Sequence, residues 1–174
     1  IGFVISVFLA RHLGSDDLGT YKIVATVFAL TTFLATLGIP SAVVKLSAEY
    51  QEDRAKLNHL ISISILYSIV IGLAFSIAVF FASDFLAAAF KMPESGDLFR
   101  ITAFAYPFSL VGGVTVAAFN GLKKMKKYCI AVVAQNICML IVSVFLLCQG
   151  MGVEAVILGI VASSVMLCLA SFTI

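Results

Sequence analysis

The 174-residue chain is poor in charge. Asp, Glu, Lys and Arg together make up 11% of it, against roughly 25% in a typical soluble domain. Hydrophobic residues reach 62%, and the mean hydropathy is +1.15. A surface helix of a soluble protein keeps one polar face, whereas the long runs here are apolar on every side. This composition excludes an ordinary soluble domain and predicts an integral membrane protein.

The sequence also lacks the residue patterns that site chemistry requires. His12 and His59 lie far apart, and the four cysteines have spacings that match neither a zinc site nor a redox CxxC pair. No nucleophile elbow, HExxH motif, glycine-rich phosphate loop or pair of carboxylates on one helical face is present. We therefore expect no enzymatic activity, no metal, no cofactor and no nucleic-acid partner.

Long apolar runs fill most of the chain. A spanning helix needs roughly 20 apolar residues, and no run shows the alternation of a barrel strand. We predict an all-α fold, a polytopic transmembrane bundle of about six helices in one domain, 1–174. Five predicted spans cover residues 21–44, 60–82, 101–122, 128–149 and 152–174, after a truncated first helix at 1–10. Both ends fall inside apolar runs, so we expect a fragment, or one half, of a longer protein.

Charge predicts the orientation of these spans. One set of alternate connectors carries seven basic residues, and the other set carries four, diluted by acidic residues. The positive-inside rule then places the basic set, and the N-terminus, in the cytoplasm. The cluster Lys123–Lys127 contributes most of this bias. Its role is either topology alone or contact with anionic lipid.

Small residues and helix breakers predict how the helices pack. Stripes of small residues at four-residue spacing indicate close contacts between helices, which serve either static packing or sliding. The three stripes are Ser64/Ser68/Gly72/Ser76, Ser109/Gly113/Ala117/Gly121 and Ala155/Gly159/Ser163. Breaks are expected at Gly38-Ile39-Pro40, and at Tyr106-Pro107 with Gly112-Gly113.

The connectors and the few polar residues within spans give further predictions. Residues 45–59 should extend a helix through the i,i+4 pairs Lys45/Glu49 and Glu52/Lys56. Residues 85–90 should form a short interfacial helix before a turn. Asn120, Gln135 and Asn136 serve either as interhelical hydrogen-bond partners or as substrate contacts.

Residues 10–21, Ala-Arg-His-Leu-Gly-Ser-Asp-Asp-Leu-Gly-Thr-Tyr, resemble the A-R-x-L-G-x-x-x-x-G-x-Y stretch after the first helix of bacterial polysaccharide flippases. These are the O-antigen and capsule (Wzx-type) transporters of the multidrug/oligosaccharidyl-lipid/polysaccharide exporter superfamily. Two weaker stretches agree: Leu37-Gly38-Ile39-Pro40 followed by Val44-Lys45, and Ala118-Phe119-Asn120-Gly121-Leu122-Lys123-Lys124.

The resemblance implies one lobe of a two-lobe exporter in the bacterial inner membrane, partnered by a C-terminal lobe and by membrane lipids. Such exporters flip lipid-linked oligosaccharide, typically on undecaprenyl pyrophosphate, by alternating access. Arg11 would then grip the pyrophosphate, unless it only anchors the helix at the interface, and Lys45 would meet it at the cytoplasmic mouth. Asn120, Gln135 and Asn136 would bind sugar hydroxyls.

Three alternatives remain open. An ion-coupled multidrug extruder of the same superfamily would favour an intramembrane carboxylate, and none is visible in the centre of a span. A flippase for a lipid-linked peptidoglycan precursor is a near relative. A membrane scaffold subunit without a substrate is the third.

Overall fold

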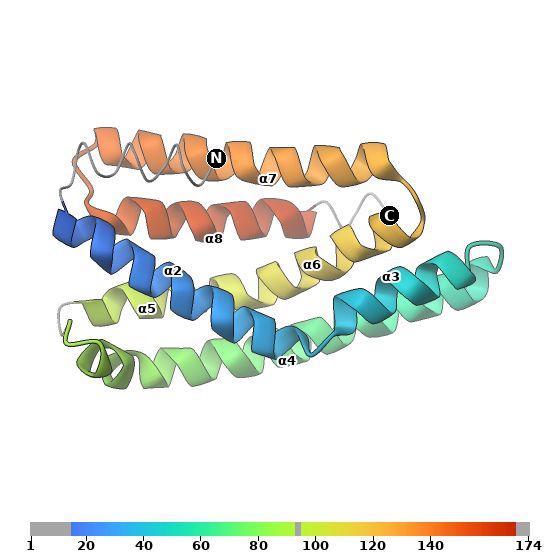
Figure 1. Cartoon of the computed structure of the whole chain (residues 1–174), viewed down its shortest axis with the longest axis horizontal. Coiled ribbons are helices and arrows are strands. Elements are labelled where there is room, and N and C mark those ends of the chain that lie inside the picture. The colour runs from blue at the N-terminus through green and yellow to red at the C-terminus, as the bar shows by residue number, and fades with distance from the viewer. Residues whose placement is uncertain (1–14, 93–94, 170–174) are drawn as a thin grey trace.

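The computed structural model describes residues 15–92 and 95–169, and this part of the chain is an elongated bundle of helices (Figure 1). The helices are α2 (Ser15–Thr36), α3 (Ile39–Glu49), α4 (Arg54–Ala89), α5 (Gly96–Ala103), α6 (Ala105–Gly121), α7 (Met125–Cys148) and α8 (Val153–Leu169). The predicted all-α membrane bundle is confirmed. The expected helix at 1–10 and the end of the last span, 170–174, lie outside the described residues.

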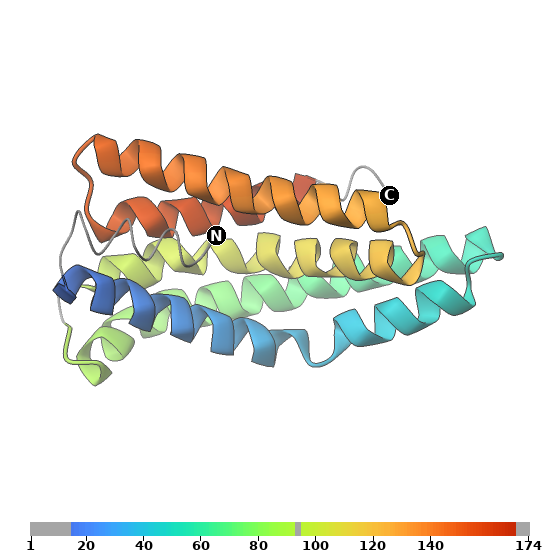
Figure 2. The ribbon, with the colours of Figure 1, turned by 45° about the horizontal axis from the view of Figure 1, so that its top comes forward.

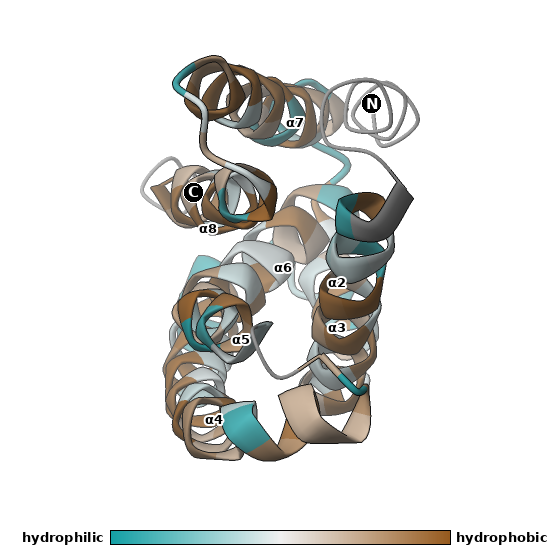
Figure 3. Cartoon of the chain, turned by 90° about the vertical axis from the view of Figure 1, so that its left-hand side faces the viewer, coloured by the Kyte–Doolittle hydropathy of each residue, from teal (hydrophilic) through white to brown (hydrophobic). Residues whose placement is uncertain are grey.

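The helices turn apolar side chains outward as well as inward. On α7, Ile130, Val133, Ile137, Ile141 and Phe145 are all exposed, at spacings of three and four residues. Figure 3 shows such hydrophobic residues along the outer sides of α4 and α7. Exposed apolar stripes of this length suit lipid rather than water.

Three described helices are long and apolar enough to cross a membrane, and a bent pair raises the number to four. They are Asp17–Thr36, Arg54–Ala89 and Met125–Cys148, with α5 and α6 as the bent pair. In this order, they correspond to the spans predicted at 21–44, 60–82, 128–149 and, for the bent pair, 101–122. The fifth predicted span, 152–174, corresponds to α8. This helix is apolar, but its 17 described residues are fewer than the 18 required of a candidate span.

The span predicted at 21–44 is not one helix. Leu37 and Gly38 both have positive φ, 42° and 81°, and Pro40 stands in the first turn of α3. Positive φ ends α2, and proline, which has no N–H to donate, is well tolerated at the start of a helix. The break predicted from Gly38-Ile39-Pro40 is therefore confirmed, and α3 continues in a changed direction (Figure 2).

The second predicted break is displaced. The helix bends by 42° between α5 and α6, at Phe104, three residues before Pro107. Because the ring of Pro107 clashes with the preceding turn and its nitrogen donates no hydrogen bond, the distortion falls upstream of it. Gly112 and Gly113, expected to contribute to the break, lie inside continuous α6.

The connector predictions need two corrections. Residues 85–90 do not form a separate interfacial helix, because α4 runs on through Ala89; its 36 residues are about 54 Å long. Residues 45–59 are not one helix, because α3 ends at Glu49 and α4 begins at Arg54, and neither predicted i,i+4 pair forms a salt bridge. Instead Asp53 caps α4 by accepting from the backbone N–H of Lys56 at 3.1 Å, and its carboxylate pairs with the Lys56 ammonium, also at 3.1 Å.

The helices meet along the small-residue stripes. A Cβ added to Gly72 of α4 would lie 2.6 Å from Pro107 Cα of α6, and one added to Gly159 of α8 would lie 2.1 Å from Ser143 Oγ of α7. The stripes of α4 and α8 thus pack as predicted. In α6 the prediction is partly wrong, because Gly113 has open space around it and Gly112 instead contacts Leu167 of α8.

Candidate functional site

A buried polar contact joins α2 to α6. The Tyr106 side chain is fully buried, and its hydroxyl forms a hydrogen bond with the Thr31 hydroxyl. The rings of Phe28 and Phe75 pack against the Tyr106 ring, with centroids 5.0 and 6.5 Å away. This contact holds the middle of α2 against the start of α6, and the sequence pattern did not identify it.

A second, tighter contact joins α3 to α6 near the other end of α6. A Cβ on Gly121 would lie 2.5 Å from the Val44 carbonyl oxygen and 2.8 Å from Ser47 Cβ. Only glycine permits this approach of two backbones. Lys45 follows Val44 on α3, and Asn120 precedes Gly121 on α6. Both side chains are exposed.

Gln135 and Asn136 are not part of that arrangement. Both are half-buried on α7, which packs against α8 and α6, whereas α3 packs against α6 and α4. The Asn136 amide donates to the Val132 carbonyl of its own helix at 2.7 Å. This bond lies within α7, so among the described residues it gives Asn136 no interhelical partner, and the role predicted for its amide, between helices or toward substrate, stays a prediction.

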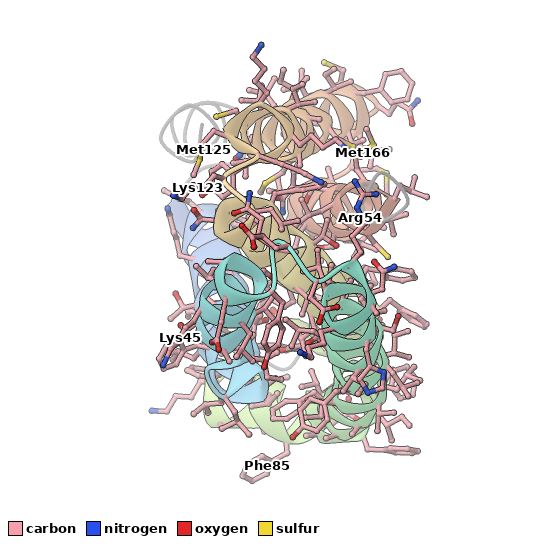
Figure 4. The ribbon with its side chains drawn as sticks, turned by 90° about the vertical axis from the view of Figure 1, so that its right-hand side faces the viewer. Lys45, Arg54, Phe85, Lys123, Met125 and Met166 are labelled. Atoms are coloured by element: carbon pink, nitrogen blue, oxygen red, sulfur yellow. The ribbon has the colours of Figure 1, made fainter. Side chains whose placement is uncertain are left out.

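Basic residues gather at one end of the bundle, which we call the basic end. Figure 4 looks onto this end, where the α3–α4 and α6–α7 connectors lie, with Lys45 and Arg54 on opposite sides of it. The basic residues of this end are those of the cytoplasmic set predicted from the sequence: Lys45, Arg54, Lys56, Lys123, Lys124, Lys126 and Lys127. Arg11, the first candidate for pyrophosphate binding, lies outside the described residues.

Ionic contacts fix the chain at both ends of α4. At the basic end, the pKa of the Asp53 carboxyl lies below its usual range, first because of the hydrogen bond from the Lys56 backbone and then because of the Lys56 side chain. At the opposite end Arg100 of α5 reaches both Asp84 oxygens at 3.0 Å, Asp97 at 3.0 Å and the Ser83 hydroxyl at 3.2 Å. Arg100 appeared in the sequence only as a connector charge.

The described residues contain no group of three His, Cys, Asp or Glu side chains that could hold a metal ion. Most charged side chains of the basic end are cations, and Asn120 adds an exposed amide on α6. Such groups bind phosphates and sugar hydroxyls by charge and hydrogen bonding, without covalent chemistry.

Comparison with known proteins identifies the family of the chain. The profile of the family described as "Polysaccharide biosynthesis protein" matches residues 1–174. The chain is also 27% identical over 173 residues to "Stage V sporulation protein B" of Bacillus subtilis (strain 168). The aligned region covers 95% of this chain and 33% of that protein. The chain thus spans about a third of the length of this relative. No solved structure matches it. The resemblance found in residues 10–21 is confirmed: the chain belongs to the polysaccharide biosynthesis protein family, whose members are polysaccharide transporters of the membrane.

Proposed function

We propose that the protein flips lipid-linked oligosaccharide from the cytoplasmic to the outer leaflet of a bacterial inner membrane by alternating access. The family match over the whole chain carries this proposal. The lipid carrier would be undecaprenyl pyrophosphate, and residues 1–174 would form one lobe that works with a second, C-terminal lobe. The basic end would then face the cytoplasm, where the substrate is made.

The contact between α3 and α6 supports a substrate site at that end. Lys45 and Asn120 are exposed and lie on backbones that touch at Gly121. An ammonium attracts a pyrophosphate, and an amide can both donate to and accept from a sugar hydroxyl. We assign Lys45 to the pyrophosphate and Asn120 to the first sugar, with Arg11 as a further pyrophosphate contact. Gln135 and Asn136 would reach the glycan only from the far side of α6.

The test is a chromosomal deletion complemented with the full-length gene. Deletion should lower surface glycan and accumulate lipid-linked oligosaccharide in the inner membrane. Lys45→Gln should restore glycan export less well than the wild type, and Arg11→Ala should do the same. Lys91→Gln is the matched control, because Lys91 is exposed at the end of the bundle opposite the basic end and the substitution removes the same charge.

Unchanged surface glycan after deletion would refute the proposed transport. Equal export by Lys45→Gln and Lys91→Gln would remove Lys45 from the site while leaving the transport intact. Membrane insertion of every variant is checked by immunoblotting of membrane fractions.

A further inference from the structure

A polar pocket opens at the basic end, separate from the contact between α3 and α6. It has a volume of about 280 Å³ and lies between the α3–α4 connector, the first two turns of α4 and the α6–α7 connector. Its polar lining consists of Gln51, Arg54, Asn58 and Lys124. Three other cavities are lined mostly by apolar side chains. Two cations and two amides therefore converge here on one space.

Within the part of the chain that the structure describes, the two cations of this pocket have no anionic partner. Neither the Arg54 nor the Lys124 side chain forms an ion pair or hydrogen bond among the described residues. Asp53, next to Arg54 in the chain, is already paired with Lys56 at 3.1 Å. The pocket thus has positive charge and free N–H donors, which is the arrangement that binds a phosphate.

The position of the pocket along α4 decides which phosphate. Arg54 precedes Leu60, the start of the long apolar run, by six residues, or about 9 Å of helix. That distance places Arg54 in the headgroup layer when the apolar run fills the hydrocarbon core. The apolar lining includes Ile61 and Leu122, which are both buried. A pocket with a cationic lining and an apolar interior at this depth matches an amphiphile with a charged head.

We propose that this pocket binds the phosphate of an anionic phospholipid headgroup. Arg54 and Lys124 contact the phosphate oxygens, and the Asn58 amide bonds a headgroup hydroxyl. A zwitterionic lipid binds less well, because its own ammonium is repelled by the two cations. Of the cluster Lys123–Lys127, only Lys124 lines the pocket, so the site needs Arg54 and Asn58 in addition to the cluster.

The test measures lipid binding by native mass spectrometry on the delipidated, full-length protein in detergent. Phosphatidylglycerol, phosphatidylcholine and inorganic phosphate are titrated separately. Arg54→Gln and Lys124→Gln should each weaken phosphatidylglycerol binding about three- to tenfold, since each removes a charge-assisted contact at a partly solvated site. Arg54→Lys should retain part of the affinity.

Lys126→Gln is the matched control, because Lys126 is exposed at the same end and does not line the pocket. It should leave phosphatidylglycerol binding unchanged. An equal loss in Lys126→Gln, or equal binding of phosphatidylcholine, would overturn the site in favour of diffuse surface attraction. Inorganic phosphate binding as tightly as phosphatidylglycerol would overturn the assignment to lipid. Far-UV circular dichroism verifies that each variant is folded.

Discussion

Gly121→Ala should destabilise the bundle, whereas Gly113→Ala in the same helix should not. The added Cβ at residue 121 would lie 2.5 Å from the Val44 carbonyl oxygen, and ordinary contacts begin at 3.4 Å. The helices α3 and α6 must therefore separate by about 0.9 Å, the difference between these distances. A gap of that size removes roughly a quarter to a half of the dispersion energy of each nearby contact between the two helices.

Overpacking of this kind costs about 1–3 kcal/mol. Replacing glycine by alanine inside a helix returns up to about 1 kcal/mol at either position. At residue 113 nothing lies within 4 Å of the new methyl group, so only the favourable term remains there. We therefore expect Gly121→Ala to be less stable than Gly113→Ala by about 1–3 kcal/mol.

The assay is unfolding of the purified protein by SDS in mixed micelles, followed by far-UV circular dichroism, since the chain has no tryptophan. Ser47→Gly provides a further check. It should not rescue Gly121→Ala, because the nearest atom is backbone oxygen of Val44 and not the Ser47 side chain. Equal stability of the two alanine variants would refute the close backbone contact.

Three further predictions concern helix packing, ion pairing and orientation. Gly159→Ala should cost about 1 kcal/mol. Ser143→Ala should restore most of this stability in the double variant, because Ser143 Oγ is the atom nearest the new methyl group and has no hydrogen-bond partner among the described residues. Additive effects of the two substitutions in SDS unfolding would contradict this. Arg100→Ala should lower stability by about 1 kcal/mol, since its ion pairs are partly exposed, and the loss should shrink in high salt; a salt-independent loss would exclude an ionic origin. In a cysteine-free background, Lys124→Cys should react only with reagent on the cytoplasmic side and Lys91→Cys only with reagent outside; the reverse labelling would overturn the orientation.

Sequence predicted best what depends on local composition. The apolar runs indicated the approximate place of the long helices, because burial in lipid requires only length and hydropathy. Gly38-Ile39-Pro40 predicted a real break for a local reason as well, since glycine readily adopts positive φ and proline starts a helix.

Features that depend on helix rotation were not predictable in the same way. Gly112 and Gly113 differ by one residue, about 100° around α6, and spacing alone does not decide which of them faces α8. The structure selects Gly112. The Arg100–Asp84 ion pair and the pocket of Arg54 and Lys124 likewise join residues far apart in the chain. No periodicity within one helix encodes such a pairing.

Of the two roles left open for the small-residue stripes, the glycine contacts favour static packing over sliding. Three close contacts converge on α6: Gly121 against Val44, Gly112 against Leu167, and Gly72 against Pro107. Sliding α6 by one turn along α3 would bring Ala117 to the place of Gly121, and its methyl group would meet the same backbone. Contacts this short therefore fix the register of α3, α4 and α8 on α6. Alternating access, as proposed, would then require this bundle to rock as one body, because its helices cannot slide past one another.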